Sequence, residues 1–277
     1  MIRKATQNDY EKVLALWNTA FGDEKNFTQW YFRNVYSYQH TVVFEKDNEI
    51  ISMLQRLPFK TNKLEKITYI YGVCTHPNYR GNGLMKQLMN YSKSLDIQEG
   101  ISASILIPQD ENLFEYYSRF EYQLAFSIKK SNYNKVQIDD NNYQIRIAQL
   151  KDIEYLHNIY TKNLQDTEYI LRDEKYWKLL LDLFKCLGGE CFIISKSSQD
   201  YGYAFVWKED NEIYIQELVA NENKIGVILV NFILEKYNIE NIEVLELGKY
   251  DTNQKLGSAV FYNEKLNREI KANLLFN

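Results

Sequence analysis

The chain has 277 residues, of which 45% are hydrophobic and 25% charged, fractions typical of a globular protein with one large or two ordinary domains. Its net charge of −4 argues mildly against nucleic acid as a partner, and its three cysteines show neither disulfide nor metal spacing. No apolar run approaches the roughly 20 residues that span a bilayer, and the N-terminus lacks the apolar core of a signal peptide. We therefore expect a cytoplasmic protein that binds no metal, no nucleic acid and no membrane; its oligomeric state is not predicted.

Hydrophobic periodicity and turn residues predict an alternation of helices and strands. The predicted elements of the first half, in chain order, are helices over residues 10–21 and 27–35, strands over 41–45, 50–59 and 67–75, a helix over 84–95, a strand over 101–107, a short helix around residue 117 and a strand over 123–130. A polar stretch over residues 131–142 predicts a linker or turn.

The most informative stretch lies between the strand over residues 67–75 and the following helix. It contains Pro77 and a short loop with Arg80, Gly81 and Gly83. Glycines have no Cβ and let the backbone approach an anion closely, while the start of a helix presents free N–H groups and the positive end of its dipole. Arg80 adds a fixed charge with several donors. The stretch therefore predicts a phosphate-binding loop, with a plain strand-to-helix turn as the alternative.

This loop resembles the acetyl-CoA site of the GCN5-related N-acetyltransferases, the GNAT family, whose signature is Val-x-x-x-Pro-x-x-Arg-Gly-x-Gly before a helix. The resemblance implies a mixed α/β (α+β) fold, with a mostly antiparallel central sheet flanked by helices, and acetyl-CoA as cosubstrate. The residues that it implies for cosubstrate binding are Val73, Cys74, Thr75, Arg80, Gly81, Asn82, Gly83, Leu84 and Met85. Met85 stands where most members have Gly or Ala, and this Gly-Leu-Met version is similar to the Eis-like acetyltransferases.

A second segment, around Tyr117, resembles the GNAT signature Phe-Tyr-x-x-x-Gly-Phe. Tyr117 matches the family's tyrosine, whereas Glu121 and Tyr122 replace the glycine and the phenylalanine. The resemblance implies that Tyr117 is the catalytic acid that protonates the leaving thiolate; a packing tyrosine is the alternative. Asp110 replaces an asparagine that often contacts the pantetheine arm, so that contact is not expected.

The sequence does not identify the general base. An alkyl amine arrives protonated and must lose a proton before it attacks. The side chains that could accept this proton are Asp23, Glu24, His40, His76 and Glu111. The terminal carboxylate serves in Eis-like relatives, which would mean Asn277, but those relatives continue into a third domain. The resemblance places the acceptor beside an aromatic wall, which suits a cationic amine, although these aromatics could equally be core: Phe21, Phe27, Trp30, Tyr31 and Tyr69.

The second half of the chain repeats the first. Residues 2–5 recur as residues 145–148, and residues 69–75 match 214–220, while Phe261-Tyr262 matches the pair Tyr116-Tyr117. Arg80 and Gly83 fall on Ile225 and Ile228, so the phosphate-binding features are lost. We therefore expect two GNAT-like folds in tandem: a catalytic domain over residues 1–140 and a degenerate domain over residues 141–277 without the pyrophosphate loop.

Together these features predict an acetyl-CoA-dependent N-acetyltransferase that transfers acetyl to a primary amine of a small molecule or peptide by direct attack. Two alternatives remain. A non-catalytic acyl-CoA-binding regulatory protein would fit the missing base and the degenerate second half. An aminoacyl transferase of the FEM type, which uses charged tRNA, is disfavoured by the acidic composition and the intact loop.

Overall fold

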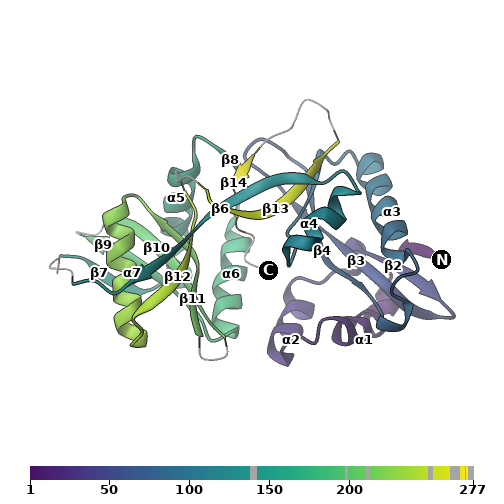
Figure 1. The fold of residues 1–277 in the computed structure, drawn as a ribbon, viewed down its shortest axis with the longest axis horizontal. Helices are drawn as coiled ribbons and strands as arrows, with labels where there is room; N and C mark the ends of the chain where they lie inside the picture. Colours follow the sequence, from purple (N-terminus) through teal and green to yellow (C-terminus); the bar gives the residue numbers. More distant parts are fainter. Residues whose placement is uncertain are drawn as a thin grey trace. The chain divides into compact units, whose positions relative to one another are not determined.

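The computed structural model describes residues 1–137, 142–196, 199–209, 212–248, 252–262, 269–271 and 273. The chain forms two compact units: Met1–Ala125 with Gly257–Arg268, and Phe126–Leu256 with Glu269–Asn277. Each unit contains a mixed, mostly antiparallel sheet flanked by helices (Figure 1). The predicted fold class and the tandem arrangement are therefore confirmed.

The first unit has the strand order β1-β2-β3-β4-β5-β13, in which β4 and β5 are parallel and the other neighbouring pairs are antiparallel. Its elements are β1 (Ile2–Lys4), α1 (Tyr10–Ala20), α2 (Lys25–Asn34), β2 (Thr41–Lys46), β3 (Glu49–Phe59), β4 (Ile67–Thr75), α3 (Leu84–Glu99), β5 (Ala103–Leu106), α4 (Glu111–Ser118) and β13 (Gln254–Phe261). Short 3-10 turns cover Gln7–Asp9, Tyr38–His40 and Pro77–Tyr79. These bounds agree closely with the predicted helices and strands.

Two clusters of side chains cover the two faces of the first sheet. On one face, α1 and α2 contribute Trp17 and Tyr31, whose rings stack 4.8 Å apart and pack against Tyr71 of β4. On the other face, α3 and α4 contribute Leu88 and Tyr117 to a buried apolar cluster. The site described below lies where β4 passes between these two clusters.

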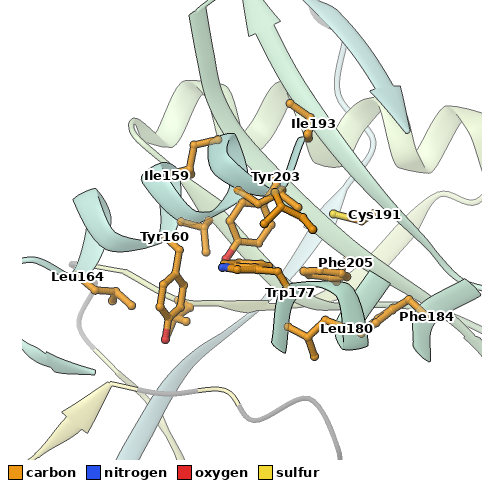
Figure 2. Close-up of a cluster of buried hydrophobic side chains, with 14 of the residues drawn as sticks. Ile159, Tyr160, Leu164, Trp177, Leu180, Phe184, Cys191, Ile193, Tyr203 and Phe205 are labelled. Atoms are coloured by element: carbon orange, nitrogen blue, oxygen red, sulfur yellow. The ribbon is translucent and has the colours of Figure 1, made fainter. Parts of the chain in front are cut away.

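The second unit has the order β7-β9-β10-β11-β12-β6, and its strand directions repeat those of the first, with one parallel pair, β11 and β12. Its elements are β6 (Gln123–Asn134), β7 (Gln144–Ile147), α5 (Ile153–Leu164), β8 (Glu168–Tyr169), α6 (Glu174–Cys186), β9 (Glu190–Lys196), β10 (Gln199–Glu209), β11 (Glu212–Ala220), α7 (Asn223–Tyr237), β12 (Asn241–Glu246) and β14 (Ile270–Lys271), with a 3-10 turn at Leu150–Asp152. Figure 2 shows the core under α5 and α6, in which Trp177 packs among Tyr160, Tyr203 and Phe205.

The last strand of each sheet comes from the other half of the sequence. In the first unit, Ser258–Phe261 of β13 pairs with β5, although it follows residues 126–256 of the second unit in the chain. In the second unit, residues 129–134 of β6 pair with β12 and precede the rest of that unit. The compact units therefore differ from the contiguous division at residue 140 that the sequence suggested. Because β-pairing joins strands at any sequence separation, hydrophobic pattern does not reveal such an exchange.

The exchange also corrects one part of the predicted repeat. Phe261 ends strand β13, and Tyr262 follows it in a bend, so this pair is not a copy of the helix that carries Tyr116 and Tyr117. Tyr262 instead donates a hydrogen bond of 2.7 Å to the buried carboxylate of Asp96, on α3. This prediction was wrong because two adjacent aromatic residues suit a strand as well as a helix.

The sequence repeat at the first strand of each unit also appears in the structure, as a repeated ion pair. Arg3 forms a two-pronged ion pair with Asp9, at 2.7 and 2.9 Å, and Arg146 forms the same pair with Asp152, at 2.6 and 2.9 Å. Each carboxylate also accepts a backbone N–H, from Thr6 and from Gln149. The hydrogen bonds from Arg3 hold the pKa of Asp9 well below its usual range. In both units, the same ion pair therefore joins the first strand to the turn before the first helix.

Within the described residues, no helix is long and apolar enough to cross a membrane. Nor do those residues include a group of three or more His, Cys, Asp and Glu side chains that could hold a metal ion.

Candidate active site

The loop between β4 and α3 leaves open space in front of its two glycines. Gly81 and Gly83 have φ angles of +79° and +69°, in the left-handed region, and a Cβ on either would meet no atom within 4 Å. Gly83 is the N-cap of α3 and provides no side-chain hydrogen bond to the first turn. The first N–H groups of α3, which include those of Leu84 and Met85, therefore point without a side-chain cap toward this open space. Such a helix start can bind an anion.

Side chains of the loop fix its shape and leave one charged group available. Arg80 is exposed and donates from Nε to the carbonyl of Thr75, at 3.2 Å, while its two terminal nitrogens have no partner among the described residues. Asn82 donates from its amide to the carbonyls of Tyr79 and Arg80, at 3.1 and 3.4 Å. His76 accepts the N–H of Asn78 at Nδ1 and caps the 3-10 turn. Asn82 and His76 thus close the loop, whereas Arg80 keeps its guanidinium tip for a ligand.

Strand β4 separates from β5 just before this loop. The two strands pair only over Ile67–Tyr69 of β4, and beyond Tyr69 no pairing with β5 is present within the described part of the chain. On its other edge, β4 bulges against β3, because the register shifts between the pairs Met53–Cys74 and Gln55–Tyr71. Gly72 lies in this bulge with a φ of +57°. A bulge of this kind frees backbone groups from the ladder.

The predicted donor-side residues of β4 fall around this opening. Val73 packs at the edge of the cluster that contains Tyr117, and Met85 of α3 packs against the same cluster. The carbonyl of Cys74 accepts the hydroxyl of Ser52 at 2.9 Å, and Ser52 also bonds the hydroxyl of Thr75 at 2.7 Å. Cys74 is buried, and burial raises the pKa of its thiol, so its side chain is a packing group.

Tyr117 lies on α4 and is 8% exposed. Its ring packs edge-on against Tyr116 and Tyr122. Burial raises the pKa of Tyr117, so the phenol keeps its proton at neutral pH. Asp110 is the N-cap of the same helix and accepts the N–H groups of Asn112 and Leu113, which explains why a carboxylate stands at that position.

The aromatic residues predicted for the acceptor side are partly brought together. Tyr31 is fully buried and contacts Phe27 and Tyr71, and Tyr71 contacts Tyr69. Phe21 is 38% exposed and packs on Trp17, and Trp30 is buried on α2. Sequence patterns did not indicate Trp17, Tyr71 and Gln55 as site residues, although the alternation of β4 puts Tyr71 on the same face as Tyr69.

The candidate bases differ in what surrounds them. Asp23 lies at an exposed position and accepts a hydrogen bond of 2.8 Å from Nε1 of Trp17, and partial desolvation raises the pKa of its carboxyl. Burial lowers the pKa of His40. Its charged neighbours include Arg56 and Glu99, and Glu99 is the last residue of α3, at the end away from the loop. Glu24 precedes α2 as its N-cap.

Glu111 is exposed in the first turn of α4, and His76 is committed to its turn at one ring nitrogen. Asn277 lies outside the described residues. Of the candidates that can be placed, Asp23 is the one in contact with the aromatic cluster beside the bulge.

The second unit lacks the loop geometrically. Strand β11 ends at Ala220 and α7 begins at Asn223, so two residues replace the eight that separate β4 from α3. Ile225 and Ile228, the counterparts of Arg80 and Gly83, are buried inside α7.

At the position that corresponds to Gly72, the second unit has a residue with a side chain. Glu217, which matches Gly72 at the offset of the strand repeat (217 − 72 = 145), is fully buried. It forms a two-pronged ion pair with Arg172, at 2.6 and 2.7 Å. Arg172 in turn donates to the carbonyl of Asn273. A buried ion pair in the second unit thus stands at the position that a glycine, packed against the ring of Trp17, holds in the first unit.

Comparison with known proteins agrees with this geometry. Residues 1–125 match the family model described as an acetyltransferase (GNAT) domain, and no curated protein matches the chain in sequence. Among solved structures, a conserved protein from Enterococcus faecalis V583, for which N-acyltransferase activity is suggested, gives a TM-score of 0.76 at 16% identity over 94% of this chain and 72% of that one. A GCN5-related N-acetyltransferase from Anabaena variabilis gives 0.74 at 18% identity over 95% and 73% of the two chains.

Residues 1–125 therefore match an acetyltransferase (GNAT) domain. The likeness in fold extends across both units: Eis1 from Mycobacterium abscessus gives a TM-score of 0.66 at 13% identity over 94% of this chain and 73% of that one.

Proposed function

We propose that the protein is an acetyl-CoA-dependent N-acetyltransferase that acts on a primary amine of a small molecule or peptide. The observation that carries this proposal is the β4–α3 loop, where Gly81 and Gly83 leave open space before an uncapped helix start and Arg80 offers free guanidinium nitrogens. The pyrophosphate of CoA is a multiply charged anion of the kind that such a site binds. The second unit, which lacks this loop, is proposed to leave CoA unbound.

The two faces of the sheet suggest separate roles in transfer. The thioester would enter where β4 separates from β5, with Tyr117 on the α3 and α4 side as the acid that protonates the leaving thiolate. The amine would approach from the α1 and α2 side, where Asp23 takes its proton. Orientation of the two reactants supplies most of the acceleration, because the amine attacks the thioester directly.

The proposed function is tested by CoA binding and by turnover. Acetyl-CoA is expected to raise the melting temperature, and a panel of primary amines is screened with release of free thiol as the readout. CoA binding without transfer to any amine would favour a non-catalytic acyl-CoA-binding regulatory protein. Binding of tRNA would favour the FEM-type aminoacyl transferase. Failure to bind acetyl-CoA at all would remove the proposal.

Tyr117→Phe is expected to lower kcat by about 100-fold, the lower end of the range for a general acid, because a thiolate leaves with modest help. The affinity for CoA should stay unchanged, since the ring is retained. Tyr116→Phe is the matched control: it removes a neighbouring phenol on the same helix and should leave kcat within a few fold. Equal kcat values in Tyr117→Phe and the wild type would exclude the role of acid.

Asp23→Asn is expected to lower kcat/KM for the amine by about 100-fold through loss of the base. The raised pKa of Asp23 also predicts the pH profile: as pH falls through that pKa the carboxylate is protonated, so activity declines at a higher pH than an ordinary carboxyl would give. The acidic limb should be absent from the profile of Asp23→Asn. Glu24→Gln, at the adjacent exposed position, is the control. An unchanged acidic limb in Asp23→Asn would assign the base elsewhere.

A further inference from the structure

Gln55 carries a hydrogen-bond donor that the protein leaves unused. It lies in the middle of β3, opposite Tyr71 of β4, and is fully buried. Its Oε1 accepts the hydroxyl of Tyr31 at 2.5 Å. Its Nε2 has no partner among the described residues. An unpaired buried donor costs about 1–3 kcal/mol, and a bound ligand with an acceptor atom would remove that cost.

The unused donor faces the bulge of β4. A Cβ built on Gly72 would lie 3.4 Å from Nε2 of Gln55 and 2.7 Å from Cζ3 of Trp17. Gly72 has no such atom and a left-handed φ of +57°, so the amide of Gln55 and the ring of Trp17 both pack close to its backbone at the bulge. This is also the stretch where β4 has left β5, which pairs with it only as far as Tyr69. The donor therefore lies next to the stretch of β4 along which the thioester is proposed to bind.

We propose that Nε2 of Gln55 donates a hydrogen bond to the thioester oxygen of acetyl-CoA and stabilises the oxyanion that forms there. This inference rests on the proposed function. The choice of oxygen follows from chemistry, because the attacking amine needs its lone pair for the new bond and an ammonium group has none. The thioester oxygen is the atom at the reacting centre that gains negative charge and can accept an N–H.

The electrons in the step balance as follows. The lone pair of the neutral amine forms the C–N bond while the π electrons of the carbonyl move onto oxygen. When the tetrahedral intermediate collapses, that pair re-forms the C=O bond and the C–S bond breaks. The thiolate of CoA takes the proton of Tyr117, and the proton that the nitrogen loses passes to solvent, from which the tyrosinate regains one. Gln55 exchanges no proton and acts only while the oxygen is negative.

The test compares two variants that both lack the Tyr31 hydroxyl, so that removal of the Gln55 amide leaves no buried phenol unpaired. Tyr31→Phe removes the hydroxyl and keeps Gln55, and the double variant Tyr31→Phe/Gln55→Met then removes the amide without creating an unpaired phenol. We expect kcat of the double variant to be about 100- to 1,000-fold below that of Tyr31→Phe, as for the loss of an oxyanion donor. The KM for the amine should change little, and the melting temperature should be equal or higher because a buried unpaired donor has gone.

A spectroscopic readout separates this role from a structural one. With [1-13C]acetyl-CoA bound, the carbonyl stretch should lie at lower frequency in Tyr31→Phe than in the double variant, because a hydrogen bond weakens the C=O bond. Equal carbonyl bands, or a change confined to the KM for the amine, would overturn the assignment of Gln55. This measurement needs no acceptor. If the wild type binds acetyl-CoA but acetylates no amine, the proposed function fails, and the carbonyl stretch of bound acetyl-CoA still tests the role of Gln55. If the wild type does not bind acetyl-CoA, both proposals fail.

Discussion

Residues 1–140 expressed alone are expected not to fold into a stable domain, although they contain every residue of the candidate site in the first unit. The missing strand is β13, whose residues Ser258–Phe261 pair with β5. Without it the edge of β5 is unpaired, and the apolar cluster that holds Tyr117 loses the buried side chain of Val260. The measurement is near-UV circular dichroism and thermal unfolding of this fragment beside the full chain.

A single substitution in the full-length chain tests the same role of β13. Val260→Asp places a carboxyl in the cluster and is expected to cost about 4 kcal/mol in the free energy of unfolding of the first unit, from lost apolar burial and an unpaired polar group. Lys255→Asp, near the exposed start of the same strand, is the control and should cost less than about 0.5 kcal/mol. A cooperative unfolding transition in the fragment of residues 1–140, with CoA binding retained, would contradict the role given to β13.

Gly83→Ala is expected to weaken CoA binding by about 100-fold while the fold survives. Because no atom lies within 4 Å of the added Cβ, the methyl group clashes with nothing in the protein. It would project into the open space proposed for the pyrophosphate, and a tenfold change in Kd corresponds to about 1.4 kcal/mol. The left-handed backbone adds a stability cost of about 1–2 kcal/mol. Isothermal titration with CoA measures the first effect, and thermal unfolding measures the second.

Gly100→Ala separates the two effects. Gly100 ends α3 with a φ of +67° and also has no atom within 4 Å of a built Cβ, so the strain is the same at the opposite end of the same helix. This variant should lose similar stability and keep its affinity for CoA. Equal affinities in Gly83→Ala and Gly100→Ala would mean that the loop does not bind the pyrophosphate.

The sequence by itself determined the fold class, the tandem repeat and the loop between β4 and α3. These features are written in short stretches: helical and strand periodicity is local, and the loop is a contiguous run in which glycine, arginine and a helix start have individual physical effects. The repeated ion pairs of Arg3 with Asp9 and of Arg146 with Asp152 are local in the same sense.

Only the tertiary structure decided which strands complete each sheet and which polar groups are left without partners. Strand β13 reaches β5 across more than a hundred residues, and nothing in its alternating pattern names its neighbour. In the same way, Gln55 is one of several polar residues in a mostly apolar strand until folding buries it, binds its oxygen to Tyr31 and turns its nitrogen toward Gly72. The physical reason is that pairing and burial depend on contacts between distant segments, whereas sequence patterns report the preferences of neighbouring residues.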